Sequence, residues 1–186
     1  MIFRAATVTP IALMAALTAV GAFIKIPLPH LPITLQISFV CLAGLLLGPW
    51  SGAASQIVYL VVGLIGFPVF AKGGGPQYVL EPSFGYLLGF VPAALVAGLV
   101  TRQSRTYGRC AVGVVAALLV DYAIGLPYLA LVMEFVLAAP MTLSAALKIG
   151  LLPLPKDLVV GLATAYLGFR VARILRPTPS PEAGPG

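Results

Sequence analysis

Long apolar runs, separated by short segments rich in proline, glycine or charge, make up most of the chain. A helix that crosses a bilayer needs about 20 predominantly apolar residues, so the chain has room for roughly six such helices. The runs that we predict to be helices span residues 5–24, 33–47, 53–65, 84–100, 110–133 and 155–170. The pattern predicts an all-α integral membrane protein, a bundle of six transmembrane helices that forms a single domain over residues 1–175.

The connections differ in length and composition. Residues 25–32 contain three prolines, which cannot continue a helix, so we expect an ordered or extended loop. Residues 66–82 are rich in glycine and proline and predict a long loop of the kind that often binds ligands. Residues 48–52 predict a tight turn, and residues 101–109 predict a polar connection.

Three further stretches depart from a simple helical pattern. Asp121 and Pro127 interrupt the apolar pattern of the fifth run. Residues 134–150 fit a loop, an interfacial helix or a short re-entrant segment. Residues 176–186 contain four prolines and predict a disordered cytoplasmic tail.

Composition and charge limit the classes of protein to which this chain can belong. Apolar residues make up 60% of the chain and charged residues only 9%, whereas soluble domains carry about 25% charged residues. These values exclude a disordered protein, a nucleic-acid binder and an ordinary cytosolic enzyme. The net charge is +6, and the basic residues lie at the ends of the apolar runs. Because basic residues favour the cytoplasmic side of a membrane, we expect both termini and all arginines in the cytoplasm and all lysines outside.

Two carboxyl groups are candidates for function. Asp121 lies about 16 Å into its helix, near the middle of the bilayer, where a carboxylate is costly and often functional. It also fits a structural group that is protonated or bonded to a tyrosine. Asp157, at the start of the last helix, either complements the helix dipole or accepts hydrogen bonds from a ligand. An intramembrane enzyme using both residues is a weak alternative, because the two lie at different expected depths.

Other chemistry is sparse. His30 is the only histidine, which argues against a metal site. Cys41 and Cys110 lie in or beside apolar runs, as small buried apolar groups do. No nucleotide-binding or hydrolase motif occurs, so we predict that the chain is not an enzyme. ATP hydrolysis, if uphill transport requires it, must come from a partner.

Small residues spaced four apart recur along several helices. Such pairs share a helix face and let a second helix approach closely, either within this bundle or on a partner. The pairs are Ala12/Ala16, Ala15/Ala19, Gly44/Gly48 and Gly85/Gly89.

Three segments in order closely resemble the BioY family: PITLQ at 32–36, LAGLLLGPWSGAASQIVYLVVGLIGFPVF at 42–70 and EPSFGYLLGF at 81–90. Members of that family are the biotin-specific substrate-binding (S) components of energy-coupling-factor (ECF) vitamin transporters. The resemblance implies six helices in the bacterial cytoplasmic membrane, with biotin held near the outer face under the first and third loops. It also implies a transmembrane coupling protein and ATPase subunits as partners. The stripe that would contact the coupling protein is Ala12, Ala15, Ala16 and Ala19.

Biotin has three chemically distinct parts to recognise. Its fused rings suit aromatic walls, its ureido group offers two N–H donors and one carbonyl, and its carboxylate requires a cation; few polar groups in an apolar pocket are typical of ligand sites. The aromatic candidates are Phe70, Tyr86 and Tyr122, the polar candidates are Gln36, Gln77 and Asp157, and the cation is Lys156.

The sequence departs from the family pattern at two places. Members usually carry Asp followed three residues later by Lys on the last helix; Asp157 matches, but position 160 is Val, and Lys156 is the nearby cation. The usual GPTxGY is EPSFGY here, and Glu81 would oppose a carboxylate ligand unless Lys72 or Lys156 neutralises it. A biotin precursor or another vitamin on the same scaffold is therefore the alternative cargo.

Overall fold

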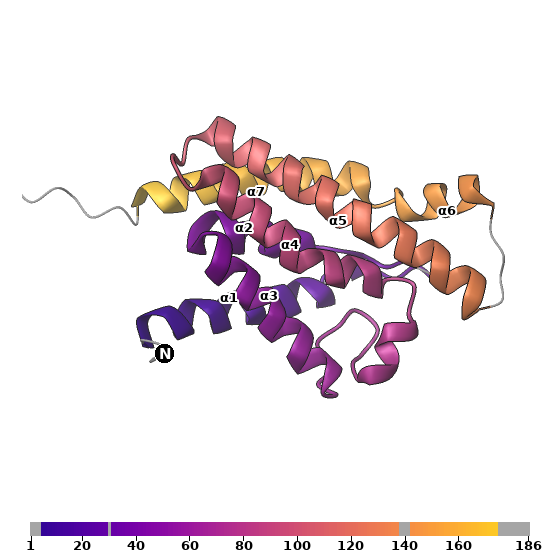
Figure 1. Cartoon of the computed structure of the whole chain (residues 1–186). Coiled ribbons are helices and arrows are strands. Elements are labelled where there is room, and N and C mark those ends of the chain that lie inside the picture. Colours follow the sequence, from indigo (N-terminus) through magenta and orange to yellow (C-terminus); the bar gives the residue numbers. More distant parts are fainter. Residues whose placement is uncertain (1–4, 30, 138–141, 175–186) are drawn as a thin grey trace, which may run out of the picture.

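The computed structural model describes residues 5–29, 31–137 and 142–174. Within these ranges the chain forms α-helices, one short hairpin and one 3-10 helix (Figure 1). The strands β1 (Lys25–Ile26) and β2 (Ile33–Thr34) pair antiparallel, and the 3-10 helix η1 (Pro76–Leu80) lies between α3 and α4. His30 and the predicted tail at 176–186 lie outside the described residues. The α-helices are α1 (Ala5–Phe23), α2 (Gln36–Leu47), α3 (Pro49–Leu64), α4 (Phe84–Thr101), α5 (Tyr107–Phe135), α6 (Leu143–Gly150) and α7 (Leu154–Ile174).

Each predicted apolar run contains a helix, so the all-α fold is confirmed. The predicted turn at 48–52 is wrong in extent, because only Gly48 lies between α2 and α3, with a φ of 81°. That left-handed backbone conformation favours glycine. Pro49 then begins α3, a position that proline's fixed φ and missing N–H suit.

The fifth apolar run forms one continuous helix, as the single predicted span requires. α5 continues through both Asp121 and Pro127 for 29 residues. The ring of Pro127 is exposed on the outer side of the helix, where a proline is tolerated. Residues 134–150, left open by the sequence, contain the end of α5 and the short helix α6, which packs against α5.

The helices run roughly side by side, with α2 in the middle (Figure 1). α2 packs against α1, α3, α4, α5 and α7, and the most extensive contact in the bundle joins α4 to α5. One large cluster of buried apolar side chains connects these helices, and it includes Leu45, Tyr59, Phe90, Val114 and Leu129.

Small residues make the close helix contacts possible, as the sequence predicted for packing within the bundle. A Cβ added to Gly44 would lie 2.3 Å from the carbonyl oxygen of Ala94 on α4. A Cβ at Gly85 would lie 2.3 Å from Cβ of Tyr128, on α5. A Cβ added to Gly48 would meet no atom within 4 Å, so this glycine is needed for the left-handed backbone conformation between α2 and α3.

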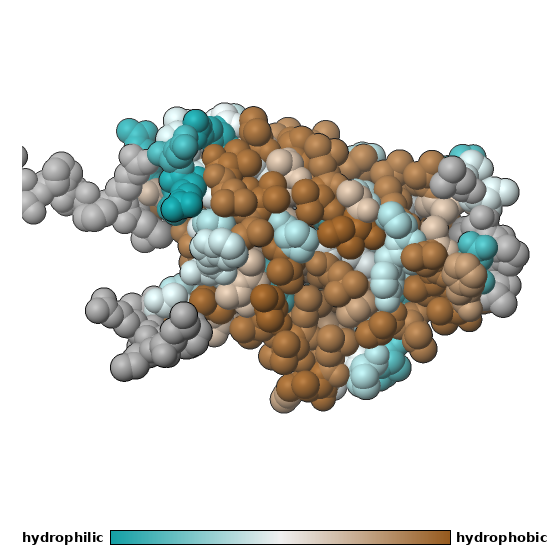
Figure 2. Space-filling view, in the orientation of Figure 1, coloured by the Kyte–Doolittle hydropathy of each residue, from teal (hydrophilic) through white to brown (hydrophobic). Residues whose placement is uncertain are grey.

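A broad apolar surface covers the middle of the molecule, and polar groups gather toward its ends (Figure 2). Large apolar side chains on α1, α3, α5 and α7 are exposed there, among them Leu13, Val61, Leu119 and Val159. Water-soluble monomers rarely expose apolar patches of this extent, so the surface fits contact with lipid.

By length and hydropathy, two of the described helices could cross a membrane on their own, Phe84–Thr101 and Tyr107–Phe135. The sequence predicted six. α2 has 12 residues, or about 18 Å of helix, and α7 contains Lys156, Asp157, Arg170 and Arg173, which lower its hydropathy.

Candidate functional site

A cavity of about 50 Å³ lies where the loop between α1 and α2, the loop between α3 and α4, and the first turn of α7 meet over the start of α4 and the middle of α5. Apolar side chains make up much of its wall. The hydroxyl, amide and carboxyl side chains that line it are Thr34, Gln36, Tyr78, Ser83, Tyr86, Asp121, Tyr122 and Asp157.

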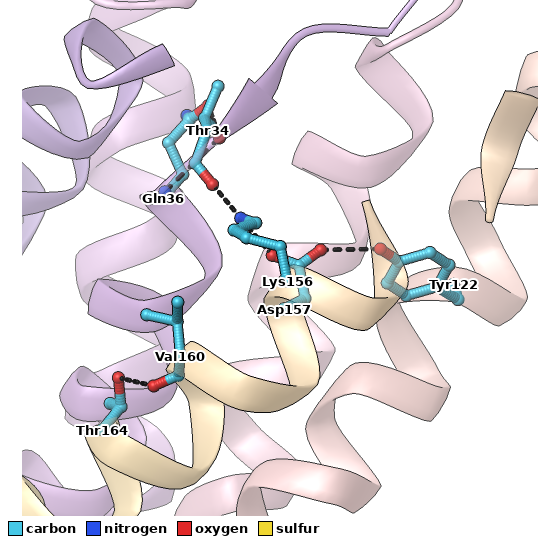
Figure 3. Close-up of polar contacts among 7 residues, drawn as sticks. All are labelled: Thr34, Gln36, Tyr122, Lys156, Asp157, Val160 and Thr164. Atoms are coloured by element: carbon cyan, nitrogen blue, oxygen red, sulfur yellow. Dashed lines mark hydrogen bonds and ion pairs between the residues drawn. The ribbon is translucent and has the colours of Figure 1, made fainter. Parts of the chain in front are cut away.

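Asp157 forms the centre of the polar contacts at the start of α7 (Figure 3). Its carboxyl group is 6% exposed and accepts a hydrogen bond of 2.6 Å from the hydroxyl of Tyr122 on α5. Lys156 forms an ion pair with the second carboxyl oxygen. Burial of a carboxylate is costly unless it is paired and hydrogen-bonded, and these two partners supply both interactions.

Lys156 joins two segments that are far apart in sequence. Its ammonium group pairs with Asp157 and also donates a hydrogen bond to the backbone carbonyl of Thr34 in β2 (Figure 3). Its side chain keeps 28% of its exposure. Lys156 is not part of the cavity lining but lies beside it, between Asp157 and the loop, at the edge of the site.

Gln36 lines the cavity as predicted, but its amide already has partners. It begins α2 and donates a hydrogen bond of 2.6 Å to the hydroxyl of Tyr59. Its carbonyl oxygen accepts from the hydroxyl of Thr34 at 3.0 Å. Tyr59 in turn donates to the carbonyl of Val69 at 3.1 Å. Gln36 therefore ties the first loop to α3 and leaves only part of its amide for a ligand.

Tyr86 and Tyr122 form an aromatic wall, as predicted. Their ring centroids are 5.4 Å apart at an interplanar angle of 83°, an edge-to-face arrangement that aromatic pairs prefer. Tyr86 donates a hydrogen bond of 2.8 Å to the carbonyl of Gly150. Both hydroxyl groups are thus anchored, which fixes the rings at the cavity.

Asp121 also lines the cavity, on the helix turn that carries Tyr122. The side chain is 2% exposed, and its Oδ1 has no hydrogen-bond partner among the described residues. Gly89 on α4 makes room for it, since a Cβ there would lie 2.3 Å from Oδ1. A buried acceptor without a partner requires an explanation, and a ligand with donors is one.

The expectation that Asp121 and Asp157 lie at different depths is wrong. Both line one cavity, because the first turn of α7 packs beside the middle of α5. The sequence gives the position of a residue along its own helix, but it does not give how far one helix is shifted along the bundle axis relative to another.

Phe70 and Gln77 do not reach the cavity lining. Phe70 is 1% exposed and packs against Gly63, Tyr59 and Tyr78, so it supports Tyr78 from behind. Gln77 is exposed on η1 and donates a hydrogen bond of 2.7 Å to the carbonyl of Gly74.

Neither of the two departures from the family pattern lies in the cavity lining. Glu81 pairs with Lys72 at 2.8 Å, and Lys72 also donates to the carbonyl of Pro29 at 2.7 Å, so the acidic charge is neutralised where the two loops meet. Val160 lies one helical turn beyond Lys156 (Figure 3) and does not line the cavity.

Several lining residues were not predicted. Ser83, Leu87 and Phe90 face the cavity together with the predicted Tyr86, and their spacing of three and four residues is that of one helix face. This periodicity in EPSFGYLLGF was the signal that could have identified Ser83, Leu87 and Phe90. Tyr78, in η1, gave no such signal; burial raises its pKa, so the phenol stays neutral.

The predicted alanine stripe borders a second, apolar depression. Ala12 and Ala16 are exposed, Ala19 is half-buried and Ala15 is buried. Together with side chains of α3 and Val69, they line a groove of about 390 Å³. The stripe therefore forms one wall of an open groove between α1 and α3.

A solved structure has a similar architecture. The crystal structure of the S-component for biotin from an ECF-type ABC transporter matches with a TM-score of 0.69 and 26% sequence identity. The match covers 90% of this chain and 91% of that one.

Sequence comparisons agree. A probable biotin transporter BioY from Lysinibacillus sphaericus is 46% identical over 169 residues, covering 89% of this chain and 86% of that protein. A probable biotin transporter BioY from Pyrococcus horikoshii is 39% identical, covering 88% and 94%. The biotin transporter BioY of Rhodobacter capsulatus is 39% identical, covering 89% and 93%. The sequence model of the BioY family matches residues 1–177. The chain therefore belongs to the BioY family.

Proposed function

We propose that this chain is the biotin-binding S component of an ECF-type transporter. It captures biotin at the outer face of the cytoplasmic membrane and delivers it inward with an ATP-driven coupling module. The observation that carries this proposal is the cavity itself, in which an aromatic pair, carboxyl groups and an adjacent lysine converge. The identity of the ligand is inferred from family membership, because the relatives described above are named biotin transporters.

The arrangement suits the three parts of biotin. The fused rings pack against Tyr86 and Tyr122. The ureido N–H groups donate to Asp121 and Asp157, and the unpartnered oxygen of Asp121 gives one of them an acceptor. Lys156, at the edge of the cavity, takes the place of the usual lysine on the last helix and binds the carboxylate.

Ligand entry requires the loops to separate. The enclosed volume of about 50 Å³ is far below the roughly 300 Å³ or more of small-molecule sites. Lys156 connects α7 to Thr34, and Lys72 connects the loop between α3 and α4 to Pro29. These polar contacts hold the structure closed, and they exchange for ligand contacts when biotin binds.

The topology that fits this role has six membrane-crossing helices, α1 to α5 and α7. The described arginines lie on the α4–α5 turn and at the end of α7, whereas the lysines lie near the cavity or on α6. The positive-inside rule then puts both termini in the cytoplasm, along with the tail at 176–186, and opens the cavity outward.

The groove beside the alanine stripe supports a docking site for the transmembrane coupling protein. Ala12 and Ala16 leave the surface of α1 open for a helix of the partner, and small residues permit close helix contacts in membranes. The ATPase subunits act through that partner.

The function is tested by calorimetric titration of the purified full chain in neutral detergent. We expect saturable binding of biotin, with much weaker binding of thiamine and riboflavin. No saturable biotin binding, together with tight binding of another vitamin, contradicts the proposed ligand and favours the alternative cargo.

Substitution of Lys156 by Met tests the carboxylate contact. Because a hydrogen bond to a charged group contributes about 1.5–3 kcal/mol, the biotin affinity should fall about tenfold to a hundredfold. Biotinamide, which lacks the negative charge, should bind Lys156→Met and the unchanged protein with similar affinity. Lys148→Met, on α6, removes an equal charge away from the cavity and should keep the affinity for biotin. An equal loss for biotin and biotinamide in Lys156→Met contradicts the assignment.

Replacement of Asp121 by Leu separates a ligand role from a structural one. Oδ1 of Asp121 has no hydrogen-bond partner within the described ranges, so an apolar group of similar size should leave the thermal stability unchanged or higher. Loss of an acceptor for a ureido N–H should weaken biotin binding about tenfold or more. Ser38→Ala is the control, since the Ser38 hydroxyl is also buried without a hydrogen-bond partner in the described part of the chain but does not line the cavity. Unchanged biotin affinity in Asp121→Leu refutes the ligand role.

A bulky residue in the groove tests the coupling face. Ala16→Trp should abolish biotin uptake by cells that contain the coupling module and leave biotin binding by the purified chain unchanged. Ala123→Trp, exposed on α5, is the matched control and should keep uptake. Normal uptake by Ala16→Trp argues against this surface as the docking site.

A further inference from the structure

A second polar pocket lies at the end of the bundle opposite the cavity. It is an open pocket of about 330 Å³ between the turn that joins α4 to α5 and the last turns of α7. Figure 2 shows polar side chains gathered over the start of α5 at this end. The lining consists of Ser104, Arg105, Thr106, Phe169 and Arg173.

The positive charge of this pocket is not compensated within the described part of the chain. Arg105 and Arg173 form no ion pair there, and the described acidic residues lie elsewhere. Glu81, Asp121 and Asp157 are in or near the cavity, and Glu134 is at the far end of α5. A pair of guanidinium groups without a carboxylate is available to an external anion.

The two arginines reach the pocket from different elements, and a backbone contact orients one of them. Arg105 donates a hydrogen bond of 3.2 Å to the carbonyl of Leu46 at the end of α2, which orients its guanidinium group. That contact uses one of the five donors of the group and leaves others free. Arg173 comes from the last turn of α7, so the two side chains reach the pocket from different elements.

The start of α5 adds a third favourable feature. Thr106 caps the helix and accepts a hydrogen bond from the backbone N–H of Arg109. The first turn contains no acidic residue, and the N-terminal end of a helix attracts anions. Arginines, hydroxyl groups and a helix N-terminus together match the oxygens of a phosphate group, which arginine binds with two parallel hydrogen bonds.

We propose that this pocket binds a phosphate group, with Arg105 and Arg173 as its charged ligands. A phospholipid headgroup is the source that best fits the surroundings, because Phe169 forms an apolar wall of the pocket and Ile174, next to Arg173 in sequence, is an exposed apolar side chain at the end of α7. Free inorganic phosphate offers the same oxygens. The proposal does not depend on the identity of the ligand in the cavity.

The test uses the full chain in neutral detergent, with phosphatidylglycerol, phosphatidylcholine and inorganic phosphate as separate probes. Native mass spectrometry measures bound lipid, and thermal unfolding measures stabilisation by each probe. The test variant is Arg105→Gln/Arg173→Gln. The control is Arg102→Gln/Arg170→Gln, which removes the same charge from the same end but not from the pocket. Size-exclusion profiles establish that both variants are folded.

We expect the unchanged protein and the control to bind phosphatidylglycerol, and the pocket variant to bind it about tenfold or more weakly. A selective loss with the lipid alone identifies the headgroup as the source, and a selective loss with inorganic phosphate identifies the free anion. Equal loss in both variants means unspecific charge attraction and overturns the proposal, as does binding that neither variant weakens.

Discussion

The burial of two carboxyl groups in an apolar bundle is the constraint on which the rest of the site depends. Asp157 is compensated within the protein, by Lys156 and by the hydroxyl of Tyr122. Asp121 is not, because its Oδ1 has no hydrogen-bond partner among the described residues. An uncompensated buried acceptor costs free energy that a matching donor recovers. A bound molecule with N–H groups completes this pair once the loops separate to admit it.

Small residues allow these carboxyl groups to meet the ligand from adjacent helices. Gly85 and Gly89 let α4 approach α5 closely, and Gly89 faces Asp121 directly. The loops then close the cavity through lysine contacts to backbone carbonyls, at Thr34 and Pro29. Rigid helices carry the recognition groups, whereas the parts that must move for ligand entry are tied by exposed or half-buried polar contacts. Such contacts exchange readily for water or for a ligand.

The sequence predicts the helices and the general place of the cavity, because apolar runs and proline-rich loops are local properties. It does not predict how the helices are staggered, and Asp121 and Asp157 therefore seemed to lie at different depths. The choice between Tyr86, which faces the cavity, and Phe70, which supports it from behind, depends on contacts between distant segments. The helical period of the fourth run indicates more of the cavity lining than the predicted site residues did, as Leu87 and Phe90 illustrate.

A crystal structure of the full chain with biotin tests the central claim most directly. The account predicts the fused rings of biotin beside Tyr86 and Tyr122, a ureido N–H within hydrogen-bond distance of Asp121, and the carboxylate near Lys156. Biotin bound in the groove between α1 and α3, or bound in the cavity with its ureido group pointing away from both carboxyl groups, would contradict it.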